Sequence, residues 1–87
     1  MKKILRLPVN VNWYNLLISG EIDWDYREIT PYWIDRLENK QYDVVEFYHR
    51  FKKEIKPIQF KFNWIRKGKI TSYDKDVFII KFGERII

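Results

Sequence analysis

The sequence contains no cysteine and only one histidine in its 87 residues. The absence of cysteine excludes disulfide bonds, thiolate metal ligands and a cysteine nucleophile, and it is most compatible with a reducing compartment. A single histidine provides no histidine pair to hold a metal ion or to catalyse hydrolysis. We therefore expect no zinc or other metal site, and no cofactor.

The sequence also lacks any long apolar run. The basic start MKKILRLPV is interrupted by Arg6 and Pro8 before the apolar part of a secretion signal would be complete, and no stretch reaches the length that spans a bilayer. We therefore expect a cytoplasmic protein with no membrane partner. Glycine and proline are few and occur singly, so no linker divides the chain, and residues 1–87 are expected to form one domain.

Aromatic and basic residues are abundant instead. Phe, Tyr and Trp make up 18% of the chain, which is enough to build a compact core without disulfides. The net charge of +5 is unevenly spread, because residues 21–46 hold most of the acids and residues 49–69 hold eight basic residues against Glu54 alone. A basic tract of this density is a candidate phosphate-binding surface. It also fits a set of lysines on exposed strand faces that prevent edge-to-edge association.

Alternating apolar and polar residues predict strands at about 3–9, 21–28, 42–48, 57–66 and 76–82. One helix is predicted to begin at Asn10 or Asn12 and to end at Ser19-Gly20, and a second to begin at Thr30-Pro31. In the fourth strand one face is expected to carry Ile58, Phe60, Phe62 and Trp64. Five strands with two helices near the N-terminus predict an α+β fold, a small β-barrel that removes its own edges by closing.

Asp25 and Arg27 give the second predicted strand a charged face. They lie two residues apart and so point the same way, while Ile22, Trp24 and Tyr26 point the other way and are expected to provide the packing. In a cleft, such a pair can recognise a base edge and a phosphate. Buried, it would instead fix the strand against the second helix. We expect a partly solvated pair, whose loss costs less than about 1.5 kcal/mol.

A second group of candidates follows the third predicted strand, where aromatic and cationic side chains alternate in a way that suits single-stranded nucleic acid. The candidate nucleic-acid-binding residues are Asp25, Arg27, Trp33, Arg36, Tyr48, His49, Arg50, Lys52, Lys53 and Lys61. We interpret His49 as an exposed loop residue rather than a general base, because no acidic partner can be assigned to it. The four tryptophans are interpreted as core residues first, with Trp33 the best candidate for a cleft rim.

The segment from Gly20 to Arg27 resembles the ASCH domain, a branch of the PUA-like β-barrel families. The family motif is a glycine, a lysine two residues on, a glutamate three later and an arginine two after that. Gly20 and Arg27 match this spacing, Asp25 stands at the glutamate and Ile22 at the lysine. The flanking Pro-Tyr-Trp helix with its arginine, and the strands YDVVEF and VFIIKFGE, extend the resemblance over nearly the whole chain.

The resemblance implies a PUA-like barrel of five to six strands with a cleft lined by the motif residues, and binding of RNA or modified nucleosides. Some ASCH relatives are implied to be acetylcytidine amidohydrolases or ribonucleases. Because that amidohydrolase chemistry needs the motif lysine, Ile22 favours a binding module, and Asp25 is the catalytic candidate if any catalysis occurs. A protein-binding accessory factor or inhibitor is a third alternative, since small ASCH-like chains occur in bacterial and phage genomes and the acidic segment 21–46 could dock a basic partner.

Overall fold

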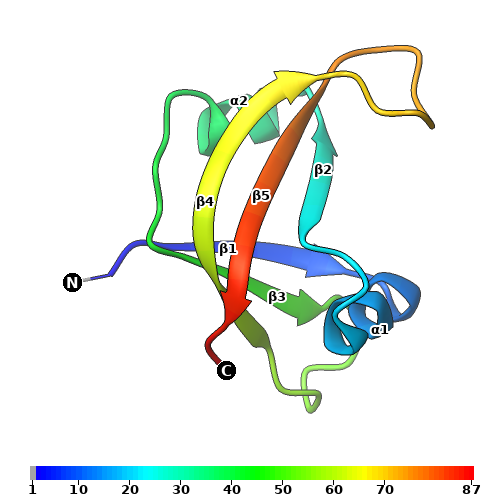
Figure 1. The fold of residues 1–87 in the computed structure, drawn as a ribbon, viewed down its shortest axis with the longest axis vertical. Coiled ribbons are helices and arrows are strands. Elements are labelled where there is room, and N and C mark those ends of the chain that lie inside the picture. Colours follow the sequence, from blue (N-terminus) through cyan, green and yellow to red (C-terminus); the bar gives the residue numbers. More distant parts are fainter. Residues whose placement is uncertain (1) are drawn as a thin grey trace.

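The computed structural model describes residues 2–87 and contains seven elements. They are β1 (Ile4–Val9), α1 (Val11–Ser19), β2 (Trp24–Glu28), α2 (Pro31–Leu37), β3 (Val44–His49), β4 (Ile58–Gly68) and β5 (Val77–Arg85). Figure 1 shows the strands as one curled sheet, with α1 and α2 at opposite ends of the view. The predicted small α+β barrel-like fold with two early helices is confirmed, in the form of a half-barrel.

The strands form a mixed sheet in the order β1-β3-β4-β5-β2. Only β1 and β3 run parallel, and the other neighbours are antiparallel. This order leaves β1 and β2 as the two edge strands. The expectation that the barrel removes its own edges by closing is therefore wrong, because no hydrogen-bonded ladder joins β1 to β2. Pro8 lies in the edge strand β1, the usual place for a proline in a sheet because an edge strand can lack one backbone N–H without breaking a hydrogen bond to a neighbour.

Both helices begin at the predicted caps. The Asn10 side chain accepts a hydrogen bond from the Trp13 backbone N–H at 2.9 Å, and the Thr30 hydroxyl accepts one from the Trp33 N–H at 3.4 Å. Each tryptophan is therefore the third residue of its helix, and the cap that starts the helix also fixes where the indole projects. Gly20 ends α1 with a φ of 77°, as the predicted left-handed stop requires.

The core fills the concave side of the sheet. The core cluster of buried apolar side chains consists of Leu5, Leu7 and Val9 of β1, Val45 and Phe47 of β3, Ile58 and Phe60 of β4, and Phe78, Ile80 and Phe82 of β5, together with Tyr14 and Leu17 of α1 and Leu37 of α2. The rings of Phe47 and Phe82 meet edge to face with centroids 5.1 Å apart. β1, β3, β4 and β5 each contribute alternate residues, as the period of two demands.

Strand β4 departs from the predicted alternation. Its pairing with β5 shifts register between Phe60 and Phe62 and again between Phe62 and Trp64, so the strand bulges there. Beyond the bulge Ile65 stands opposite the buried Ile80 and packs on the core, while Trp64 stands opposite Lys81 and lies under the Arg66 guanidinium, 4.4 Å from the ring centroid. The prediction that Trp64 shares the core face is therefore wrong.

We predict that Gly20→Ala lowers the free energy of unfolding by about 1 kcal/mol, because an L-residue is strained at the positive φ of this position. No atom would contact the added methyl group, so the effect isolates backbone strain. Gly83→Ala is the matched control, since its Cβ would meet Asn63 at an ordinary 3.5 Å. Urea denaturation of both variants measures the difference, and equal stability of the two would contradict the assignment.

Candidate functional site

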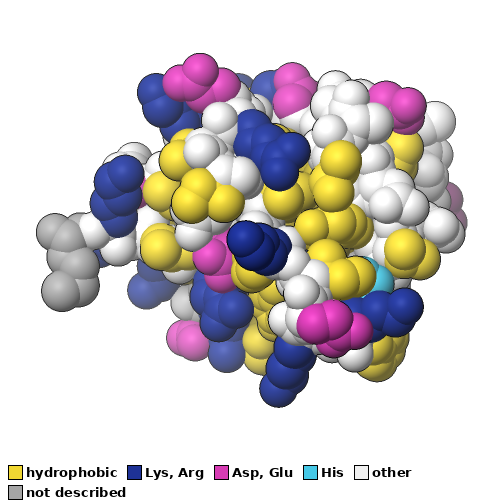
Figure 2. All heavy atoms as spheres, turned by 90° about the horizontal axis from the view of Figure 1, so that it is seen from below, with side chains coloured by type: hydrophobic (Ala, Val, Ile, Leu, Met, Phe, Trp, Pro, Cys, Tyr) yellow, Lys and Arg dark blue, Asp and Glu magenta, His cyan; other side chains and the backbone are white. Residues whose placement is uncertain are grey.

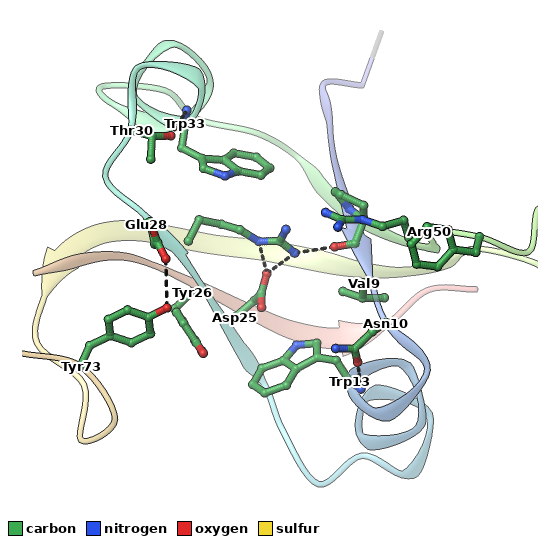
Figure 3. A pocket seen from close by; sticks show the side chains of 13 residues that line it. Val9, Asn10, Trp13, Asp25, Tyr26, Glu28, Thr30, Trp33, Arg50 and Tyr73 are labelled. Carbon is green, nitrogen blue, oxygen red and sulfur yellow. Dashed lines mark hydrogen bonds and ion pairs between the residues drawn. The ribbon is translucent and has the colours of Figure 1, made fainter. Parts of the chain in front are cut away.

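A cleft of about 430 Å³ lies between the two edge strands, where the sheet does not close. This volume falls within the range of roughly 300–1,000 Å³ that is usual for small-molecule sites. Its walls come from six segments: Pro8 and Val9 at the end of β1 with Asn10 after it, Trp13 of α1, Asp25 to Glu28 of β2, Thr30 and Trp33 at α2, Arg50 and Phe51 after β3, and Tyr73 before β5. Figure 3 shows these side chains around a central charged pair.

The charged pair is Asp25 and Arg27. The Arg27 Nε donates to Asp25 Oδ2 at 2.9 Å, and its second terminal nitrogen lies 2.8 Å from the same oxygen. That nitrogen also donates to the Pro8 carbonyl oxygen at 2.9 Å, across the gap between β2 and β1. The two side chains are only 6% and 13% exposed, so the expectation of a partly solvated pair is wrong.

The pair is buried because of how β2 faces the core. Asp25 stands directly opposite Ile80, which is fully buried, and residues opposite one another in an antiparallel pair share a face. Asp25 therefore points into the concave side of the sheet. Trp24 and Tyr26 point outward and are only half-buried, so the expectation that they carry the packing of β2 is wrong.

Arg27 also reaches the second helix. Its guanidinium lies 5.0 Å from the centroid of the Trp33 ring, in cation–π contact. One side chain thus joins β2, β1 and α2. Fixing β2 against the second helix is the structural role expected from the sequence for a buried pair. The same side chain lines the cleft, so the bracing role and a ligand-facing position coincide.

Burial raises the pKa of the Asp25 carboxyl above its usual value of 3.8. The charge of Arg27 and its hydrogen bond act in the opposite direction and offset part of this shift. Loss of hydration is the larger effect, because the carboxylate exchanges water for one cationic partner at a nearly dry position.

Trp13 adds an unsatisfied polar group to the cleft wall. Its indole Nε1–H is buried and has no hydrogen-bond partner among residues 2–87. In Figure 3 the indole lies on the far side of Asp25 from Trp33, with its nitrogen turned toward the carboxylate. Buried donors are nearly always satisfied in folded proteins, so an unpaired donor at a cleft wall is a candidate ligand contact.

The predicted site residues do not all meet here. Asp25, Arg27, Trp33 and Arg50 line the cleft. Tyr48, His49 and Lys53 line a separate depression together with Arg6. Arg36 stacks on Tyr32 at 3.5 Å, Lys52 is exposed in the loop after β3, and Lys61 pairs with Glu84 on an exposed part of the sheet. The basic tract 49–69 therefore does not act as one surface, and only its first residues border the cleft.

His49 is not the exposed loop residue expected from the sequence. It is the last residue of β3 and is 7% exposed. Its Nδ1 accepts hydrogen bonds from the backbone N–H groups of Phe51 at 3.3 Å and Lys52 at 3.2 Å. The side chain thus holds the turn that leaves β3, and it is buried because that turn folds over it.

Several cleft residues carried no recognisable signal in the sequence. The sequence favours a core position for Trp13. The one signal that it shares with Trp33 is its position, since each is the third residue of a capped helix. Tyr73 comes from a loop without periodicity, and its hydroxyl donates to Glu28 at 3.1 Å. That hydrogen bond raises the pKa of Tyr73 above its usual value.

The motif position Ile22 is half-buried and packs against the core. None of the lysines in the described part of the chain lines the cleft. Among residues 2–87, no group of three or more His, Asp or Glu side chains is arranged to hold a metal ion. The helices of this same part of the chain are all too short or too polar to cross a membrane.

Half-barrel and cleft together define the chain as a small α+β protein with a ligand-sized site at the open edge of its sheet. Comparison with protein-family models, with curated proteins and with solved structures finds no match. The resemblance to ASCH domains therefore stays a prediction from the sequence.

We predict that Arg27→Ala costs about 3–5 kcal/mol of stability, because it leaves the Asp25 carboxylate buried without its partner. Replacing both residues together, as Asp25→Leu with Arg27→Met, should cost less than Arg27→Ala alone, since no charge is then abandoned. Chemical denaturation of both variants measures this difference.

Arg6→Ala is the matched control for this experiment. Arg6 pairs with Glu46 at 2.7 Å but is 61% exposed, so its loss should cost less than about 1 kcal/mol. If Arg27→Ala were no more destabilising than Arg6→Ala, the bracing role of Arg27 would be refuted.

A second prediction concerns pH. Because the folded pKa of Asp25 is raised, the folded protein holds this proton more tightly than the unfolded chain does. The contribution of Asp25 is therefore largest at acid pH and is lost as the pH rises from about 3.8 through the raised pKa. Relative to Asp25→Asn, the wild type should lose stability over that range in denaturation experiments. A relative gain would mean that Arg27 outweighs burial.

Proposed function

We propose that the protein binds a single unpaired base of RNA, or a modified nucleoside, in the cleft between β1 and β2. The observation that carries this proposal is the combination of aromatic walls with a buried charged pair. Trp13 and Trp33 come from the first turns of the two helices, and Asp25 and Arg27 lie between them (Figure 3). A planar ligand with a polar edge fits both features.

The polar groups suit the edge of a base. Both contacts from Arg27 use the Oδ2 atom of Asp25, and a carboxylate oxygen can also accept from an exocyclic amine or a ring N–H. The indole N–H of Trp13 offers a donor that has no partner among residues 2–87. A donor and an acceptor on one wall are what hydrogen bonding to the edge of a splayed-out base requires.

Charge around the cleft supports a phosphate-bearing ligand. The ion pairs among residues 2–87 are Arg6 with Glu46, Arg27 with Asp25, Lys61 with Glu84, Lys67 with Glu38, and Lys81 with Asp23. They leave Arg50, Lys52 and Lys53, at the rim and in the adjoining loop, without a carboxylate partner within this part of the chain. Figure 2 shows a face that includes the single histidine, His49, and there Lys and Arg are interspersed with Asp, Glu and apolar side chains.

The resemblance to ASCH domains implies the same class of ligand. Binding rather than amide hydrolysis is proposed because Ile22 stands at the lysine position and packs against the core. The residues from 2–87 that form the cleft wall include no lysine and are suited to hydrogen bonding and stacking.

The proposal predicts that ribonucleosides and their monophosphates quench or shift tryptophan fluorescence on binding. Trp33→Ala should weaken binding about tenfold, because loss of one stacking partner removes about 1–3 kcal/mol. Asp25→Asn should change which bases are preferred, since an amide offers both a donor and an acceptor. Titration by calorimetry at low salt gives the affinities.

Trp64→Ala is the matched control, because Trp64 lies on the outer side of β4 and does not line the cleft. It should leave binding unchanged. If no nucleoside, mononucleotide or RNA binds at micromolar protein, the proposal is wrong. A nuclease-resistant protein partner captured from cells would then favour the protein-binding alternative.

A further inference from the structure

We infer that the natural ligand is a single strand of nucleic acid rather than a free nucleoside. One base would occupy the cleft, its neighbour would stack on Phe51, and Arg50 would hold the phosphate between them. This inference rests on the proposed function and specifies its ligand. The residues involved, Arg50 and Phe51, lie at the rim of the cleft rather than in its interior.

Phe51 is the most exposed of the large apolar side chains in residues 2–87, at 81%. An exposed ring in a loop is unremarkable by itself. Phe51 differs because it also borders the cleft, beside the aromatic walls that would hold a base. A ring at that position extends the stacking surface beyond the space available to one nucleoside.

The backbone that carries Phe51 is held in place. His49 Nδ1 accepts hydrogen bonds from the Phe51 and Lys52 N–H groups, and the Arg50 N–H donates to the Val9 carbonyl at 3.0 Å. His49 is itself buried and lies edge-on to the Tyr14 ring, with centroids 6.3 Å apart. The ring is thus presented to solvent from a fixed turn, which limits the entropy lost when a base stacks on it.

Arg50 directly precedes Phe51 in the sequence, and both residues line the cleft. In Figure 3 it stands on the β1 side, across the cleft from Glu28 and Tyr73. Its guanidinium has no carboxylate partner among the described residues, and Lys52 and Lys53 continue the positive charge along the loop. An aromatic ring flanked by unpaired cations is the arrangement that tracks a single strand, with rings on bases and cations on phosphates.

RNA and single-stranded DNA share this chemistry, so both are probes in the test. Fluorescence anisotropy would compare a labelled mononucleotide with octamers of rU, rA and dT. The octamers should bind at least about tenfold more tightly than the mononucleotide, because a second stacked base contributes about 1–3 kcal/mol. Because dT also carries a 5-methyl group, a dU octamer is added, and preference between the rU and dU octamers shows whether the 2′-hydroxyl is recognised.

Variants of the rim test the residues separately. Phe51→Ala and Phe51→Leu should remove most of the gain from mononucleotide to octamer, while Phe51→Trp should retain it, because the π face rather than apolar area is required. Arg50→Ala should lower the salt dependence of octamer binding by about 0.7 in log–log slope, the value for one phosphate contact on a single strand. Arg85→Ala, an exposed arginine outside the cleft, is the matched control.

The outcomes separate the two proposals. Mononucleotide binding without a gain for octamers, or equal loss of both on Phe51→Ala, would overturn the single-strand inference and leave the base-binding cleft intact. Failure of every nucleoside and oligonucleotide to bind would overturn both. A gain for octamers that depends on Phe51 and Arg50 would establish the path of the strand.

Discussion

The arrangement of this half-barrel depends on the contacts of one group, the Arg27 guanidinium. The sheet ends in two edge strands, and Arg27 spans the gap between them by binding Asp25 within β2 and the Pro8 carbonyl of β1. Its stacking on Trp33 adds the second helix to the same point. A single planar side chain with several donors can make these contacts together, whereas a lysine would offer only one nitrogen.

Burying this pair is an unfavourable way to join two strands. Removing a carboxylate and a guanidinium from water costs energy that their attraction returns only with good geometry, and apolar residues of similar volume often stabilise a protein more. The unpaired indole N–H of Trp13 is a second polar group kept at a cost in the same wall. A buried ion pair and an unpaired buried donor both lower stability, and two such features at one cleft are typical of a binding site.

Local signals predicted much of the fold and part of the site. Helix starts at Asn10 and Thr30 and the stop at Gly20 follow from side-chain caps and a positive φ, which involve only neighbours in the chain. Strand positions follow from alternation. The pairing of Asp25 with Arg27 could be anticipated because residues two apart on a strand share a face, but its closeness to Pro8 and Trp33 could not, since these contacts join separate elements.

The sequence by itself determined which segments are strands and helices, and that each strand has two faces. Only the tertiary structure decided which face of β2 is inside. Alternation shows that a strand has two faces but not which one is buried, and Asp25 points inward because it pairs with Ile80 of β5. In the same way the bulge in β4 turned Trp64 outward, and the turn after β3 folded over His49. The basic tract 49–69 was divided because its residues lie on a loop and on a curved strand that face different directions, a separation set by the curl of the sheet.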